Sequence, residues 1–152
     1  MVGIIFFALF IMARNGPIII VEDDADDEAV FTDILKELHV PNKVIWFGNS
    51  RDAFNYLKTT HEKPFMIFSD VNLPGENGIE FKRRIDHDKQ LREKSIPFVF
   101  YSTSVDKQAV NEAYTKMTVQ GFFKKGNSYD EIKNHIRLIF DYWQICKHPN
   151  CE

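Results

Sequence analysis

The stretch FMIFSDVNLPGENG, residues 65–78, decides the fold of this chain. Its first four residues are apolar and predict a short buried strand, and the carboxylate of Asp70 follows at the tip of that strand. Most of the residues after Asp70 are turn formers. Because open parallel α/β sheets bind ligands beyond the carboxyl ends of their strands, we expect a functional site at Asp70.

A second apolar run ends in acids in the same way. Residues 18–21 predict another buried strand, and Glu22, Asp23 and Asp24 follow it directly. Adjacent carboxylates repel one another unless a hard cation binds between them. If both strands lie in one sheet, the acids that follow them predict a pocket for a divalent cation.

Short apolar runs alternate with longer amphipathic ones along the rest of the chain. Continuously apolar strands indicate a parallel sheet that is buried on both faces. Five strand–helix units fit an α/β fold of the flavodoxin type: a doubly wound five-stranded parallel sheet, with strand order 2-1-3-4-5 and about five helices. That order places strands 1 and 3 side by side, and with them Glu22, Asp23 and Asp70. The predicted strands are 18–21, 44–47, 65–68, 97–101 and 121–123, and the predicted helices are 26–38, one that Ser50 caps, 79–91, 105–117 and 129–146.

Length and composition favour one domain. The 152 residues are 44% hydrophobic and 27% charged with a formal net charge of −3, which is typical of a globular protein and gives no general attraction to nucleic acid. We expect a domain over 17–147, an apolar extension over 1–16 and a tail over 148–152. Cys146 and Cys151 would close only a short loop, so reduced thiols in a cytoplasmic protein are expected.

Residues 2–12 are almost wholly apolar. The run is too short for a membrane-spanning helix, which needs about 20 apolar residues, and no basic residue precedes it as in a signal peptide. Three interpretations stay open: a segment that packs on the domain or on a neighbour, an upstream translation start with little function, and a weak membrane anchor.

The residue types at the remaining strand tips suit phosphoryl chemistry. Mg²⁺ takes oxygen ligands and keeps several waters, so two carboxylates and a backbone carbonyl suffice to bind it. Asp70 can then attack a phosphoryl group with a free oxygen. Ser102 ends the fourth strand and Lys125 follows the fifth, and each can contact a phosphoryl oxygen. If Phe123 is buried, alternation along the strand favours Lys125 over Lys124.

Four motifs in this order resemble the receiver domain of two-component response regulators: IVEDD (20–24), DVNLPGENG (70–78), PFVFYS (97–102) and GFFKK (121–125). The resemblance covers about residues 17–147, and the segment YSTS (101–104) looks most like small single-domain receivers. It implies that a sensor histidine kinase or a histidine phosphotransfer protein donates a phosphoryl group to this chain. The chain would then be a phosphoacceptor that assists its own phosphorylation and dephosphorylation, rather than an enzyme.

The resemblance also implies a role for each site residue. Asp70 would be the phosphoacceptor, and Mg²⁺ would bind to Asp23, Asp70 and the backbone carbonyl of Asn72, with Glu22 assisting through water. Three further residues would contact the phosphoryl group or respond to it: the switch hydroxyl Ser102, the switch aromatic Phe122 and the amine Lys125.

Three residues depart from the usual pattern of the family. Gly126 stands after the lysine, where proline with a cis bond is common, so this peptide bond can be trans. Thr103 occupies a position usually held by a small residue beside the phosphorylation site, which would slow phosphoryl entry. Glu22 replaces the commoner aspartate, a change that water-mediated assistance tolerates. Asn72 and Ser104 border the pocket and should influence the lifetime of the phosphoryl group.

Simpler interpretations stand beside these. Acids at a helix N-terminus stabilise the helix without any metal, and we favour that role for Asp24, Asp26, Asp27 and Glu28. The chain could also be a phosphorylation-independent adaptor with a vestigial pocket, or a small phosphohydrolase that forms an aspartyl phosphate. The phosphohydrolase needs a second acid two residues after the nucleophile, where Asn72 stands and cannot transfer a proton.

Partners follow from the leading interpretation. Signals would pass to an unknown downstream protein through protein contacts, with no nucleic acid and no membrane span expected. Phe140, Tyr142 and Trp143 cannot all face one side of the last helix, and this leaves a homodimer open.

Overall fold

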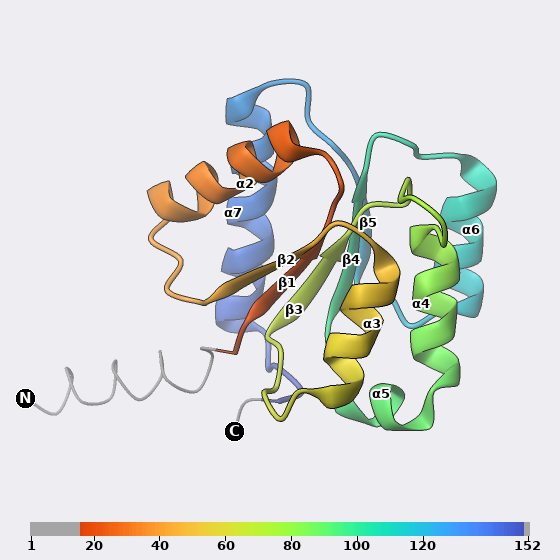
Figure 1. Cartoon of the computed structure of the whole chain (residues 1–152). Helices are drawn as coiled ribbons and strands as arrows, with labels where there is room; N and C mark the ends of the chain where they lie inside the picture. The colour runs from red at the N-terminus through yellow and green to blue at the C-terminus, as the bar shows by residue number, and fades with distance from the viewer. Residues whose placement is uncertain (1–15, 151–152) are drawn as a thin grey trace, which may run out of the picture.

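Five short strands form a parallel sheet in a computed structural model of the protein, which describes residues 16–150 (Figure 1). The order β2-β1-β3-β4-β5 confirms the predicted doubly wound topology. The predicted apolar run 2–12 lies outside the described residues, as does Cys151. The strands are β1 (Ile18–Val21), β2 (Val44–Phe47), β3 (Met66–Ser69), β4 (Phe98–Ser102) and β5 (Gly121–Lys124).

Six helices flank the sheet in the described part of the chain, one more than expected. Within residues 16–150, none of them combines the length and apolar character needed to cross a bilayer. The helices α2 and α7 lie on one face of the sheet, and α3, α4 and α6 lie on the other (Figure 1). Their bounds are α2 (Ala25–Glu37), α3 (Ser50–Thr59), α4 (Gly78–His87), α5 (Lys89–Lys94), α6 (Lys107–Lys116) and α7 (Tyr129–Ile145).

The extra helix arises because the predicted helix 79–91 is broken at Asp88. This residue has an extended backbone, and its side chain accepts the Leu91 N–H and so caps α5. The same carboxylate accepts from Lys58 on α3 at 2.8 Å. An aspartate that competes for backbone donors and gains a cation favours a cap over a helix interior.

One predicted cap is wrong by a single residue. Asn49, not Ser50, is the N-cap of α3, and its side-chain oxygen accepts the Asp52 N–H at 2.9 Å. Ser50 is buried and donates its hydroxyl to Glu76 Oε1 at 2.8 Å. Both residue types make good caps, so the sequence pattern could not separate them.

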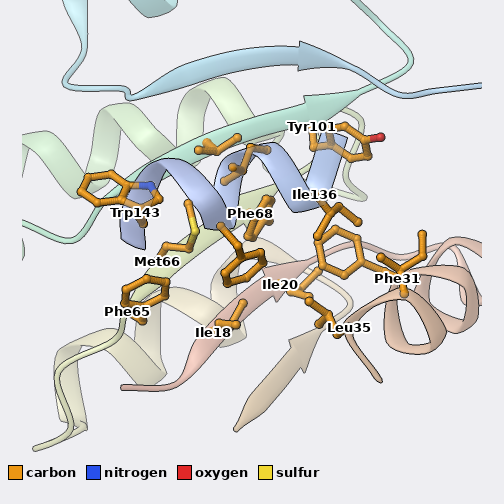
Figure 2. Packing of buried hydrophobic residues seen from close by; sticks show 14 residues of the cluster. Ile18, Ile20, Phe31, Leu35, Phe65, Met66, Phe68, Tyr101, Ile136 and Trp143 are labelled. Atoms are coloured by element: carbon orange, nitrogen blue, oxygen red, sulfur yellow. The ribbon is translucent and has the colours of Figure 1, made fainter. Parts of the chain in front are cut away.

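Alternation along each strand builds one core on each face of the sheet. In β1, Ile18 and Ile20 pack toward α2 and α7, whereas Ile19 and Val21 pack toward the other face. Figure 2 shows the first of these clusters, in which Phe68 of β3 lies between side chains from β1 and α7. Because β1 and β3 are buried along their whole length, the residues at their tips emerge from a rigid support.

Segments near both ends of the described chain meet at Phe65, just before β3. The Phe65 N–H donates to the Pro17 carbonyl at 2.8 Å, and the Phe65 carbonyl lies 2.5 Å from His148 Nε2. The imidazole is fully buried and stacks on the Phe65 ring, with centroids 4.8 Å apart. The chain on both sides of the domain is therefore fixed at the amino edge of the sheet.

Candidate functional site

The carboxyl ends of β1 and β3 bring Glu22 and Asp70 together. Val21 pairs with Ser69 in the parallel register, and the Asp70 N–H donates to the Val21 carbonyl at 3.0 Å. Residues one position beyond these partners therefore leave the sheet side by side. Both carboxyl groups are buried, with Glu22 8% and Asp70 6% exposed.

Asp70 is held at both of its carboxylate oxygens. Oδ1 accepts hydrogen bonds from the Ser102 hydroxyl at 2.6 Å and from the Asn72 N–H at 3.1 Å. Oδ2 accepts from the Lys125 ammonium at 2.9 Å. The tips of β3, β4 and β5 thus converge on one carboxylate, although Lys125 lies 55 residues after Asp70.

The ammonium of Lys125 lies among three carboxylates. Its Nζ donates to Glu22 Oε2 at 2.6 Å, to Asp27 Oδ2 at 2.8 Å and to Asp70 Oδ2 at 2.9 Å. Lys124 is exposed, so of the two neighbouring lysines only Lys125 reaches the acids. Because one ammonium serves three carboxylates, the site carries excess negative charge whenever all three are ionised.

The pKa values of the two buried acids are shifted in opposite directions. Burial, assisted by the charge of Asp70, raises the pKa of Glu22 to about 7. Burial also acts to raise the pKa of Asp70, but hydrogen bonds from Ser102 and Lys125 outweigh it, and the pKa is lowered. Burial opposes the charge of Lys125, yet its bonds to Asp27, Glu22 and Asp70 raise its pKa. At neutral pH, Asp70 is therefore an anion and Lys125 a cation.

Asp27 makes a site contact that the sequence interpretation missed. It was expected only to stabilise the start of a helix, and it does lie in the first turn of α2, which Asp24 caps. Its side chain also reaches Lys125, because Cα–Cβ bonds in a helix tilt toward the N-terminus. No pattern in the sequence indicated this contact, because an acid in the first turn of a helix is already explained by the helix itself.

The residues expected to border the pocket take different positions. The Asn72 amide donates to the Ser104 hydroxyl at 2.6 Å, and the Ser104 N–H donates to the Ser102 hydroxyl at 3.2 Å. Ser104 therefore links the loops that follow β3 and β4. Thr103 is exposed between them.

Gly78 allows the loop that carries Asp70 to turn back on itself. A Cβ at this position would lie 2.1 Å from the Asp70 carbonyl oxygen and 2.9 Å from the Val71 Cα. The Gly78 N–H donates to the Val71 carbonyl at 2.8 Å, and α4 begins here under the cap of Asn77. Because both obstacles are backbone atoms, only glycine fits without a shift of the loop.

Two predicted site residues take no part in this hydrogen-bond network. Asp23 is exposed. Phe122 is half-buried and packs on Phe100, with ring centroids 5.1 Å apart, and its N–H donates to the hydroxyl of Tyr114 at 2.9 Å. The role of Phe122 as a switch aromatic stays a prediction.

The donor set at the carboxyl edge fits a hard cation. Glu22, Asp23 and Asp70 supply carboxylate oxygens, the donors that Mg²⁺ prefers. Burial raises the pKa of Glu22 and the charge of Asp70 adds to the rise, so a divalent ion beside the two carboxylates would favour their ionised forms. Within residues 16–150, no three Asp, Glu, His or Cys side chains are already arranged as a metal cluster.

A family model described as the response regulator receiver domain matches residues 18–137 of the chain. Among curated proteins, the chain is similar to FilR2 of Methanothrix harundinacea (strain 6Ac), described as a probable methanogenesis regulatory protein. The two are 27% identical over 131 residues, which cover 83% of this chain and 82% of the relative.

Solved structures give the same family likeness. The phosphorylated cyanobacterial phytochrome response regulator RcpA superposes with a TM-score of 0.80 at 25% identity, covering 89% of this chain and 99% of that one. The Mn(2+)-bound response regulator Rcp1 gives 0.78 at 23% identity, covering 88% and 99%. The receiver domain of the sensor histidine kinase PA1611 from Pseudomonas aeruginosa PAO1, with a magnesium ion in its active-site cleft, gives 0.65 at 18%, covering 86% and 98%. The last two bear on the fold alone.

Proposed function

The chain belongs to the response regulator receiver family, and on that premise we propose that it is a phosphoacceptor switch in two-component signalling. Asp70 takes the phosphoryl group from a phosphohistidine of a sensor histidine kinase or a histidine phosphotransfer protein. The observation that carries this proposal is the convergence of Ser102 and Lys125 on the Asp70 carboxylate, at 2.6 and 2.9 Å. A hydroxyl and an ammonium suit a transferring phosphoryl group, because its oxygens share the negative charge.

The proposed reaction is a displacement at phosphorus. An Asp70 oxygen forms a bond to phosphorus while the bond to the donor's imidazole nitrogen breaks, and the electron pair leaves with that nitrogen. The lowered pKa of Asp70, in which hydrogen bonds outweigh burial, keeps this nucleophile ionised. Ser102 and Lys125 then donate to phosphoryl oxygens in place of the carboxylate oxygens.

We propose Mg²⁺ as the cofactor, held by Asp23, Asp70 and the backbone carbonyl of Asn72, with Glu22 acting through water. When bound, the ion would neutralise charge on the incoming phosphoryl oxygens. Relatives of the same fold were crystallised with a divalent ion, Mn(2+) in Rcp1 and magnesium in the PA1611 receiver. The Lys125 ammonium already binds Glu22 and Asp70, so it would share the charge of these two carboxylates with that cation.

Output would pass through protein contacts in the cytoplasm. We expect the phosphoryl group to draw Ser102 toward it and to let Phe122 repack, which would change the surface formed by α6, β5 and α7. The bond between the Phe122 N–H and the Tyr114 hydroxyl supports this coupling, because it ties the aromatic residue of β5 to α6.

Intact-mass measurement with acetyl phosphate tests the function. Wild-type protein should gain the mass of one phosphoryl group when Mg²⁺ is present and none when EDTA replaces it. Asp70→Asn should gain none, because the amide lacks the nucleophilic oxygen anion. Asp52→Asn serves as the matched control, since Asp52 is an exposed acid in the first turn of α3. Equal labelling of Asp70→Asn and wild type would refute the proposal.

A further inference from the structure

The position of the Lys125 ammonium depends on the backbone from which it extends, and two hydrogen bonds fix that backbone. The Lys125 N–H donates to the Ser102 carbonyl at 2.9 Å. The next N–H along the chain, that of Gly126, donates to the Tyr101 hydroxyl at 3.3 Å. These N–H groups belong to the two peptide planes on either side of the Lys125 Cα, so the two bonds restrain both of its free dihedral angles.

The Tyr101 hydroxyl is itself oriented by a partner. Tyr101 is 6% exposed, and its oxygen lies at the edge of the apolar cluster in Figure 2. The Gly126 N–H can only donate, so the phenol oxygen accepts from it. His135 Nδ1 lies 3.2 Å from the same oxygen and accepts the phenol proton in the tautomer that carries its own proton on Nε2. Burial raises the pKa of Tyr101, so the phenol stays neutral and able to donate. Gly126, Tyr101 and His135 thus form a directed chain of hydrogen bonds.

Residue 126 has no side chain to hold its backbone in place. Glycine has the freest backbone of any residue, and its peptide bond to Lys125 is trans, as is every peptide bond in the described chain. A Cβ here would lie 3.0 Å from the Ile132 backbone nitrogen, so a side chain could not anchor this position without a shift. A cavity of about 30 Å³, lined in part by Tyr101, Asp70 and Lys125, gives the lysine room to move if its backbone is released.

We propose that Tyr101 is a positioning residue for Lys125: its hydroxyl, oriented by His135, binds the Gly126 N–H and so aims the ammonium at Asp70. This inference rests on the proposed function of the Asp70 site. Lys125 acts on phosphoryl oxygens, whereas carboxylates bind the cation. Loss of the Tyr101 hydroxyl should therefore slow phosphorylation without weakening Mg²⁺ binding, because a loosened ammonium competes less for the carboxylate oxygens.

Tyr101→Phe tests this with the least structural change. At saturating Mg²⁺, we expect its phosphorylation by acetyl phosphate to be about five- to tenfold slower, the equivalent of one lost hydrogen bond. Its Mg²⁺ affinity should be unchanged or higher. The matched control is Tyr56→Phe, which also removes a buried hydroxyl, but one with no hydrogen-bond partner among the described residues. His135→Leu should share the defect of Tyr101→Phe, and His135→Gln, which keeps an acceptor, should restore part of the rate.

Amide hydrogen exchange at Gly126 supplies a readout that needs no phosphorylation. Its N–H should exchange faster in Tyr101→Phe than in wild type, and at the wild-type rate in Tyr56→Phe. Unchanged exchange, or faster exchange with an unchanged phosphorylation rate, overturns the inference. So does a parallel fall in Mg²⁺ affinity, which would indicate general disruption of the site. If wild-type protein itself is not phosphorylated, the proposed function fails. The inference then fails with it, whatever the Gly126 exchange rates are, because Lys125 has no phosphoryl group to contact.

Discussion

Glu22 is a residue whose charge destabilises the folded protein, because burial raises its pKa from 4.5 to about 7. The folded chain binds this proton more tightly than the unfolded chain does, so the contribution of Glu22 to stability falls as the pH rises from 4.5 through 7. Replacing Glu22 with Gln should raise the free energy of unfolding at pH 8 by on the order of 1 to 3 kcal/mol in metal-free protein.

Urea unfolding in EDTA at pH 5 and pH 8 measures this effect. The gain from Glu22→Gln should shrink toward pH 5, where the wild-type acid is protonated, and should shrink at pH 8 when Mg²⁺ is added. Glu37→Gln is a suitable control, because the pKa of this exposed acid is shifted in the opposite direction. The hydrogen bond from Lys133 is the main cause that lowers it. An equal loss of stability in Glu22→Gln at both pH values would contradict the expected direction.

Single residues also show what the sequence could and could not reveal about the site. Glu22 and Asp70 were predictable as neighbours, because each follows a buried strand and the fold fixes the order of those strands. Asp27 was not, because its place in a helix already explained its charge. A helix-stabilising acid and a site acid have the same sequence signature when they lie in the same first turn.

A buried charge cluster joins α4 to the end of α6 on the far side of the sheet from α7. Lys82 is only 3% exposed, and its Nζ donates to Asp86 Oδ1 at 2.8 Å and to the Thr118 hydroxyl at 3.0 Å. Asp86 also accepts the Thr118 N–H at 3.0 Å. The pair therefore anchors the segment that leads into β5.

Lys82→Met should lower the free energy of unfolding by about 3 kcal/mol, because it leaves the buried Asp86 charge without its cation. Thermal or urea unfolding would measure the loss. The double variant Lys82→Met/Asp86→Asn should recover part of it, since the second change removes the uncompensated charge. A double variant that is no more stable than Lys82→Met would show that the anion is not the source of the loss.

At the level of elements, strands were easier to predict than helix ends. Four apolar residues bounded by turn formers define both ends of a strand, and the predicted ranges of β1 and β2 match the structure. Helix ends depend on which of several competent side chains takes the cap. Asn49 and Ser50 compete at α3, and the break at Asp88 depends on Lys58, which lies 30 residues earlier in the chain.

At the scale of the whole molecule, His148 joins the C-terminal segment to the core. It is 2% exposed, stacks on Phe65, and meets the edge of the Trp143 ring with centroids 5.4 Å apart. No periodic pattern in the sequence marks this contact, because a single side chain makes it from an irregular segment.

His148→Ala should lower the free energy of unfolding by about 2 to 4 kcal/mol, since it leaves a cavity and an unsatisfied Phe65 carbonyl. His148→Phe should lose less, because it keeps the stacking and removes only the hydrogen bonds of the imidazole with the Phe65 carbonyl and the Asn150 N–H. Urea unfolding gives the magnitude, and Trp143 fluorescence reports whether the segment detaches first. Wild-type stability in His148→Ala would show that the contact contributes nothing.

The meeting of Pro17 and His148 at the backbone of Phe65 has a practical consequence. Linkers attached near these two residues leave the protein at the amino edge of the sheet, whereas Asp70 opens at the carboxyl edge. A fluorescent reporter or a sensor-chip tether joined on either side would thus leave the acidic pocket free to meet a kinase. The same proximity makes the pair a natural joint for a circularly permuted biosensor with new ends nearer the pocket.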